Sequence, residues 1–263
     1  MTRIVKIYRG LSGSTYVYFS SEQPPSGLTQ TTLISQKVVE DSFDVNLFSP
    51  VEVWTLDGVS GLTGSFSGGL ITVANGTLQF GPGPREKSLS VYVDGNDRLT
   101  AAVSSAYQIT QPMTTTCLIY PINIASADSY PMSMGNTEGS EANNVLYSFV
   151  LQTDNNLATY YESGSAETDI TVAASTYSIT HGTWNHLATT RTSDGFVKLY
   201  HNGVLVTSAS SGLATGGTNA ALSIGGFHGG VNYFTGLIST IKIFDKVLSE
   251  DEVRADAANS LDG

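Results

Sequence analysis

The stretch Gly195-Phe-Val-Lys-Leu-Tyr-His-Asn-Gly-Val-Leu-Val206 decides how this chain folds. Val197 and Leu199 alternate with other residues before Asn202-Gly203, and Val204 and Val206 do so after it. Alternation with a period of two is typical of a β-strand that turns one face toward a core. Asn-Gly favours the left-handed backbone of a tight turn, so the stretch predicts a β-hairpin.

Other segments of the chain follow the same two-residue period and are separated by glycine-rich turns. Their spacing is typical of a two-sheet antiparallel sandwich, so we expect an all-β protein. The clearest alternating runs lie at residues 89–93, 145–152 and 241–244.

One short helix is predicted at the C-terminal end. Ser249-Glu-Asp-Glu252 has the pattern of a capping box, in which the serine hydroxyl and the Glu252 carboxylate each accept a backbone N–H. Leu248 and Val253 flank it at the positions of a hydrophobic staple. We expect this helix to pack on the edge of the sandwich.

Several segments carry a resemblance to a known family. The order and spacing of the segments from about residue 88 onward resemble the laminin-G-like jelly roll of the concanavalin A-like lectin/glucanase superfamily. The resemblance implies a two-sheet antiparallel jelly-roll sandwich, but such folds host lectins, adhesins, glycosidases and structural modules. The pair Ser239-Thr240 departs from the family, which often has acidic residues there. The matching segments are Leu89-Ser-Val-Tyr-Val-Asp-Gly-Asn-Asp97, Gly182-Thr-Trp-Asn-His-Leu-Ala-Thr-Thr-Arg191, the hairpin above, Ala221-Leu-Ser-Ile-Gly-Gly226, Phe234-Thr-Gly-Leu-Ile238 and 241–253.

A domain boundary is predicted at Gly81-Pro-Gly-Pro84, because two Gly-Pro pairs stop regular strand pairing. We therefore expect a small N-terminal β domain or attachment arm at residues 1–85 and the jelly roll at residues 86–263. The first carries 6 acidic and 5 basic residues, and the second carries 17 and 7.

The composition excludes several classes of protein. Only 13% of the 263 residues are charged, and the formal net charge is −11, which opposes binding to nucleic acid or to an anionic membrane. No apolar run is long enough to insert into a membrane, and the lone Cys117 is expected to be a buried core residue. The acidic field favours neutral sugars over anionic ones.

A glycine-rich loop holds the candidate carbohydrate-binding residues. Phe227, His228, Asn232 and Tyr233 are of the types that stack on a pyranose ring and hydrogen-bond to it. The alternative is that this loop packs its aromatic rings on the rim of the sandwich. Trp184 is expected in the core.

Calcium is the metal that the sequence allows. Asp94 and Asp97 lie in one turn, and loop carboxylates are common calcium ligands in laminin-G-like domains. The alternative is that these aspartates only stabilise their own turn by hydrogen bonds to its backbone. We expect no cofactor to be required.

Catalytic patterns are incomplete. A retaining glucanase on this fold needs paired carboxylates, and Glu167-Thr-Asp169 begins such a pattern, but position 172 is Val. The protein is therefore not expected to be an enzyme, although a glycoside hydrolase remains an alternative.

The N-terminal strand carries three basic residues, Arg3, Lys6 and Arg9. Such a strand can add to the edge of a partner's sheet, so we expect it to dock the chain onto a major capsid or tail protein. The alternative is an ordinary solvated strand. The N-terminus lacks the apolar core of a signal peptide, which favours assembly in a host cytoplasm. The leading hypothesis is a homo-oligomeric bacteriophage virion protein, either a capsid decoration or a tail-fibre component, that displays a lectin-like domain. The alternative is an extracellular bacterial carbohydrate-binding or adhesion module.

Overall fold

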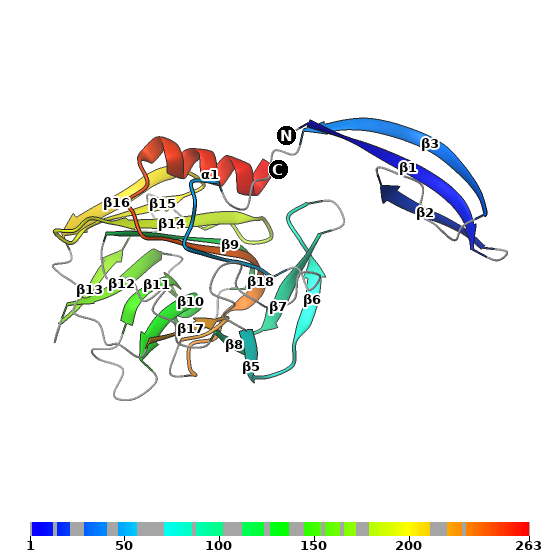
Figure 1. Ribbon diagram of the computed structural model, residues 1–263. Coiled ribbons are helices and arrows are strands. Elements are labelled where there is room, and N and C mark those ends of the chain that lie inside the picture. Colours follow the sequence, from blue (N-terminus) through cyan, green and yellow to red (C-terminus); the bar gives the residue numbers. More distant parts are fainter. Residues whose placement is uncertain are drawn as a thin grey trace. The chain divides into compact units, whose positions relative to one another are not determined.

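The computed structural model describes residues 2–12, 15–21, 29–40, 47–56, 71–85, 88–101, 112–123, 127–136, 145–153, 156–163, 166–171, 179–210, 220–227 and 230–262. They belong to two compact units, one within residues 1–44 and one within residues 45–262 (Figure 1). Among these residues no helix is long and apolar enough to cross a membrane.

The N-terminal unit is a three-stranded antiparallel sheet. Strand β1 (Thr2–Ser12) lies between β2 (Thr15–Ser21) and β3 (Thr29–Glu40). Arg3, Lys6 and Arg9 all lie on β1, which pairs with β3 from Thr2 to Leu11 but with β2 only from Lys6 to Ser12. At Lys6 and Arg9 the backbone of β1 is therefore already paired on both sides, and the docking role of Arg3, Lys6 and Arg9 stays a prediction.

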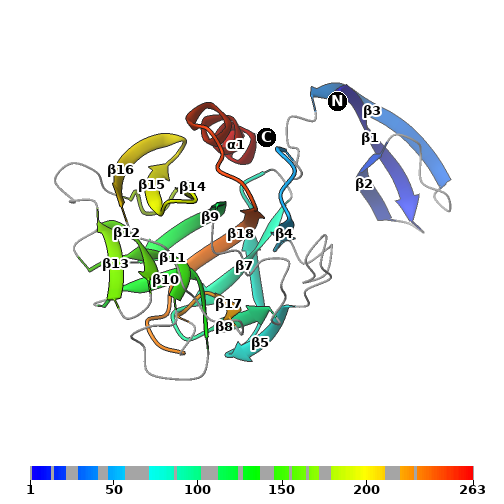
Figure 2. The same cartoon turned by 60° about the vertical axis from the view of Figure 1, so that its left-hand side comes forward.

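The larger unit is a sandwich of two antiparallel sheets (Figures 1 and 2). The first sheet has seven strands in the order β13-β12-β11-β10-β17-β8-β5. The second has eight, in the order β16-β15-β14-β9-β18-β7-β6, with β4 also paired to β18. The all-β jelly-roll sandwich expected from the sequence is confirmed.

The strand bounds of the seven-stranded sheet are β5 (Ile71–Asn75), β8 (Arg98–Ala101), β10 (Ser129–Asn136), β11 (Val145–Leu151), β12 (Leu157–Ser163), β13 (Ala166–Thr171) and β17 (Ala220–Ile224). Those of the eight-stranded sheet are β4 (Glu52–Thr55), β6 (Gln79–Pro82), β7 (Leu89–Asp94), β9 (Met113–Asn123), β14 (Asn185–Arg191), β15 (Phe196–His201), β16 (Val204–Ser210) and β18 (Thr235–Phe244).

The two-residue alternation of the strands builds the core between the sheets. Leu187, Leu199 and Ile241 of the eight-stranded sheet meet Met134 and Phe149 of the other sheet in one buried cluster. The cluster also contains Cys117, and burial raises the pKa of its thiol, as a core cysteine requires. The predicted hairpin is confirmed, because Asn202 and Gly203 both have positive φ between β15 and β16.

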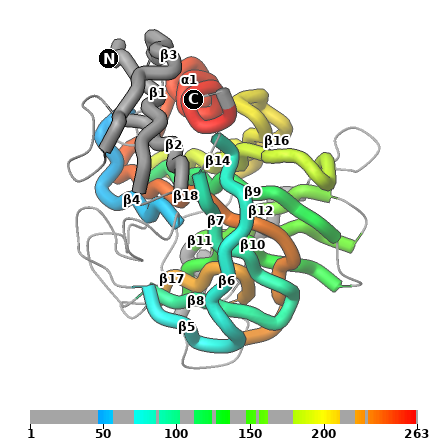
Figure 3. The backbone as a smooth tube through the Cα atoms, turned by 90° about the vertical axis from the view of Figure 1, so that its right-hand side faces the viewer, coloured from blue at the N-terminus to red at the C-terminus, as the bar shows by residue number. Residues whose placement is uncertain are grey.

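The jelly roll begins before the predicted boundary. Strand β4 pairs with β18, β5 with β8, and β6 with β7, so residues upstream of 86 supply three of its strands (Figure 3). Trp54 of β4 is buried in the core of the sandwich. The structure therefore divides the chain after residue 44 instead of after residue 85. This division gives residues 1–44 four acidic and four basic residues, and leaves nineteen and eight to the rest.

The C-terminal helix α1 (Glu250–Asp262) begins as predicted. The Ser249 N–H donates to Glu252 Oε2 at 2.7 Å, and the Glu252 N–H donates to Ser249 Oγ at 3.3 Å, so the capping box is confirmed. Leu248 and Val253 are buried together with Ala188, Tyr200 and Phe244 of the eight-stranded sheet. The helix therefore covers the outer face of that sheet, and the expected position at an edge is wrong.

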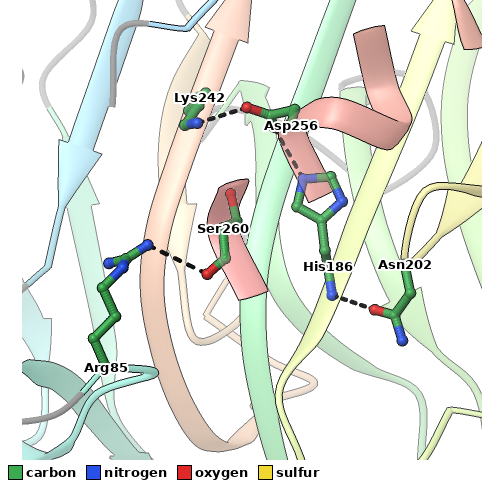
Figure 4. Close-up of polar contacts among 6 residues, drawn as sticks. All are labelled: Arg85, His186, Asn202, Lys242, Asp256 and Ser260. Carbon is green, nitrogen blue, oxygen red and sulfur yellow. Dashed lines mark hydrogen bonds and ion pairs between the residues drawn. The ribbon is translucent and has the colours of Figure 1, made fainter. Parts of the chain in front are cut away.

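Buried polar contacts fasten α1 to the sheet (Figure 4). Asp256 lies between two partners, with Oδ1 2.6 Å from Lys242 Nζ and Oδ2 3.0 Å from His186 Nε2. The Arg85 guanidinium donates to the carbonyl of Ser260 at 3.3 Å, near the C-terminal end of the helix. The buried His186 thus contacts α1 through Nε2.

Candidate binding site

A row of aromatic residues crosses the outer face of the eight-stranded sheet. Leu237 of β18 is paired with Tyr92 on β7 and with Tyr120 on β9. The flanking residues Val93 and Ile119 lie in the core, so Tyr92 and Tyr120 project from the opposite, outer face.

Trp184 extends this row across one more strand. It directly precedes β14, whose first residue, Asn185, pairs with Ile119 beside Tyr120. The rings of Tyr120 and Trp184 meet edge to face, with centroids 5.6 Å apart. The Trp184 side chain is only partly buried, so its expected place in the core is wrong. We call Tyr92, Tyr120 and Trp184 the aromatic row.

The aromatic row lines a cavity of about 390 Å³. None of the described residues that line the cavity carries a charge. Gly81 lies close to Leu237, and a Cβ at position 81 would lie 2.6 Å from Leu237 Cδ2, so that side chain would have to move. The lining therefore includes two tyrosines, whose side chains carry a hydroxyl, and one tryptophan, whose indole carries an N–H. The lining residues of the cavity are Gly81, Pro82, Gly83, Tyr92, Tyr120, Ile122, Trp184 and Leu237.

The predicted carbohydrate-binding loop folds back onto the other sheet. Phe227 is only 6% exposed, and its ring lies 4.7 Å from that of Tyr130. Val150, Ala158 and Tyr160 complete this small cluster. The Phe227 ring is therefore not free to stack on a sugar, while His228 lies outside the described residues.

Asn232 and Tyr233 have different surroundings in this loop. The Tyr233 hydroxyl donates to the carbonyl of Gly230 at 2.8 Å and accepts from Asn75 Nδ2 at 3.2 Å, so it fastens the loop. Asn232 is exposed, and its carbonyl accepts the N–H of Tyr130. The alternative of a packed rim loop accounts for Tyr233, and a role of Asn232 in ligand binding stays a prediction.

Asp94 and Asp97 are engaged by the backbone. The two carboxylate oxygens of Asp97 accept the N–H groups of Thr77 and Asp94, and Asp94 Oδ1 accepts the N–H of Asn96. No group of three or more His, Cys, Asp or Glu side chains in the described ranges is placed to hold a metal ion. These bonds agree with the alternative in which the aspartates stabilise their turn.

Calcium is accordingly expected to leave the thermal stability of the protein unchanged. A cation bound to the folded state alone would raise the melting temperature. The measurement is Tm with excess EDTA and with excess CaCl₂. A higher Tm in CaCl₂ that disappears in Asp97→Asn would show that these aspartates are calcium ligands.

The incomplete glucanase pattern lies at the margin of the seven-stranded sheet. Glu167 and Asp169 are on β13, where their backbones pair with Glu162 and Tyr160 of β12. The placement of their side chains lies outside the described part of the chain.

Two members of the aromatic row, Tyr92 and Tyr120, were not singled out by the sequence analysis. The available signal was the position of each tyrosine in the two-residue alternation. Each is an aromatic residue at an outward position of a strand whose inward positions are apolar. That signal becomes specific only when the strand order places the two tyrosines on either side of Leu237.

Comparisons with known proteins agree with this architecture. The family described as the concanavalin A-like lectin/glucanases superfamily, of the laminin G type, matches residues 94–254. No curated protein matches the sequence.

Three solved structures illustrate the likeness. Domain 4 of AbnA, a GH43 extracellular arabinanase from Geobacillus stearothermophilus in complex with arabinotriose, has a TM-score of 0.60 and 19% identity over 79% of this chain and 98% of that one. The binding domain of botulinum neurotoxin serotype G has a TM-score of 0.60 and 13% identity, over 80% of this chain and half of that one. The CBM40 of the Ruminococcus gnavus IT-sialidase has a TM-score of 0.53 and 15% identity, over 63% of this chain and 95% of that one.

These structural likenesses show the shared fold, and the family match covers more than half of the sequence. The chain belongs to the concanavalin A-like lectin/glucanase superfamily.

Proposed function

We propose that this chain is a non-enzymatic glycan-binding module whose site is the cavity along the aromatic row. The observation that carries the proposal is the partial exposure of three aromatic side chains in one concave site of about 390 Å³, whose described lining residues carry no charge. Aromatic faces with a few hydrogen-bonding groups are the usual composition of a small-molecule site, and they suit the apolar face of a sugar ring.

The net charge of the larger unit indicates which class of glycan the cavity would bind. The larger unit holds the whole net charge of −11, while none of the described residues around the cavity is charged. An acidic domain repels anionic ligands over long range, which favours neutral oligosaccharides. The complex of AbnA domain 4 with arabinotriose makes that trisaccharide a reasonable member of a neutral test panel.

Replacing Trp184 by alanine is expected to weaken oligosaccharide binding by about 2 kcal/mol, or about 30-fold in Kd. The indole supplies the largest aromatic face in the cavity, and its removal also separates Tyr120 from its edge-to-face partner. Isothermal titration calorimetry with the best ligand of the neutral panel measures the change.

Phe196→Ala is the matched control for this measurement. Phe196 is an exposed aromatic residue on β15 of the same sheet, and it does not line the cavity. Equal losses in Trp184→Ala and Phe196→Ala, or none in either, would reject the cavity as the binding site.

We also propose that the module acts on a bacteriophage particle, as a capsid-decoration or tail-fibre protein. Residues 1–44 would attach it to a major capsid or tail protein, and the jelly roll would be displayed as a homo-oligomer. The support is the division into a small unit with balanced charge and a larger acidic one, since mutual repulsion keeps crowded copies soluble.

The particle proposal is tested by mass spectrometry of purified virions. The chain is expected at a stoichiometric copy number, and deleting residues 1–44 should remove it from particles while the jelly roll stays folded. Absence of the full-length chain from the particle would contradict this role and favour an extracellular carbohydrate-binding module, in which neighbouring catalytic domains are expected.

A further inference from the structure

Trp184 is carried by a short turn that buried polar groups hold in place. The turn covers residues 180–184 and connects to β14. Its backbone reaches the neighbouring strand through the Gly182 N–H, which donates to the carbonyl of Pro121 at 2.9 Å. Gly182 has φ of +70°, a backbone conformation that residues other than glycine rarely adopt.

The side chain of Asn185 holds this turn by hydrogen bonds. Its Nδ2 donates to two carbonyls of the turn, those of Thr180 at 2.9 Å and Thr183 at 2.8 Å. Both N–H groups of the Asn185 amide thus bind the turn that carries Trp184. Asn185 is 1% exposed, and burial of a donor strengthens its hydrogen bonds.

The oxygen of the same amide is fixed by a histidine on another strand. Asn185 Oδ1 lies 2.7 Å from Nε2 of His201, the last residue of β15. His201 is also buried, and burial followed by the charge of His186 lowers its pKa to about 4. The imidazole is therefore neutral at pH 7, with its proton on Nε2 to donate to the amide.

We propose that Asn185, oriented by His201, is a positioning residue that sets Trp184 in the aromatic row for ligand binding. We call this connection of His201, Asn185 and the two turn carbonyls the Asn185 bridge. The inference rests on the proposed function of the cavity. It follows from geometry, because removing the amide frees the turn without removing any atom that lines the cavity.

The test uses two substitutions that break different halves of the bridge. Asn185→Asp keeps an oxygen for His201 but loses both donors to the turn carbonyls. His201→Ala removes the group that orients the amide, whereas His201→Gln keeps a side-chain N–H donor. Asn185→Asp and His201→Ala are expected to raise Kd by about tenfold or more, and His201→Gln to restore most of the affinity.

Trp184 fluorescence gives a readout that does not depend on a ligand. The chain has two tryptophans, so Trp54→Phe leaves Trp184 as the sole indole. In that background Asn185→Asp and His201→Ala are expected to change the emission maximum of Trp184 and to increase its quenching by acrylamide, while His201→Gln stays close to the parent.

Leu248→Ala controls for a loss of stability alone. Leu248 is buried under α1, away from the cavity, so this variant is destabilised without a change in the Trp184 turn. Unchanged Kd and unchanged Trp184 emission in Asn185→Asp would overturn the bridge, as would equal losses of affinity in Leu248→Ala. If the unmodified protein binds no glycan, the proposed function fails, and the fluorescence arm still decides whether Asn185 positions Trp184.

Discussion

Asp256→Ala is expected to lower the free energy of unfolding by about 3–5 kcal/mol, the largest effect that we predict for a single substitution. Asp256 is completely buried and neutralises the ammonium of Lys242 at 2.6 Å, while it also accepts from His186. Alanine removes the carboxylate and leaves the Lys242 ammonium buried without the negative charge of Asp256. Urea unfolding followed by circular dichroism measures the loss.

Asp251→Ala is the matched control in the same helix. Asp251 also pairs with a basic residue, Arg254, at 2.7 Å, but it is 90% exposed. Water already screens such a pair, so little change in stability is expected. If the two substitutions lowered the free energy of unfolding by similar amounts, burial would not be the reason that the Asp256 contacts stabilise the fold.

Acid is expected to destabilise the protein in two steps, the first between about pH 6.5 and pH 4. Burial, and then the charge of His186, lowers the pKa of His201 from 6.5 to about 4 in the folded state. As the pH falls, the His201 imidazole is therefore protonated in the unfolded chain before it is protonated in the folded one. The contribution of neutral His201 to the free energy of unfolding is complete above pH 6.5 and is lost below it. The expected loss between about pH 8 and about pH 5 is about 2 kcal/mol.

The second acid step belongs to Asp256. Burial acts to raise its pKa, but the hydrogen bond and charge of His186, together with those of Lys242, outweigh burial and lower the pKa from 3.8 to about 2. The contribution of Asp256 is therefore complete above pH 3.8 and is lost as the pH falls toward 2.

Urea titrations at a series of pH values distinguish the two steps. His201→Gln should lose the first step and keep the second, because glutamine does not titrate. A first step of full size in His201→Gln would show that another group is responsible for it.

Local sequence signals predicted local structure well. The Asn202-Gly203 turn, the Ser249 capping box and the alternating core residues depend on neighbours within a few positions, and each is confirmed. The N-terminal boundary of the jelly roll depends on pairing across long stretches of sequence, as between Trp54 and Ile241. The Gly-Pro pairs indicated a break, but Gly81 and Pro82 are the last residues of β6 and pair with β7, within the larger unit.

The candidate site was harder to predict for the same reason. Phe227 and Trp184 are both aromatic residues beside glycines, and composition does not distinguish a packed ring from an accessible one. Only the strand order shows that Phe227 lies against Tyr130, whereas Trp184 joins Tyr120 at a cavity. The charge pattern, in contrast, followed from the sequence, and the structure sharpens it by assigning the whole net charge to the larger unit.

The most direct test of the proposed site is a titration of the ¹⁵N-labelled protein with the neutral oligosaccharide panel, followed by NMR. Two indole N–H signals are expected, from Trp54 in the core and Trp184 in the cavity. Binding at the aromatic row predicts that the Trp184 signal shifts with ligand concentration while the Trp54 signal stays in place. Shifts confined to the backbone around Asn232 and Tyr233, with an unmoved Trp184 indole, would contradict the account.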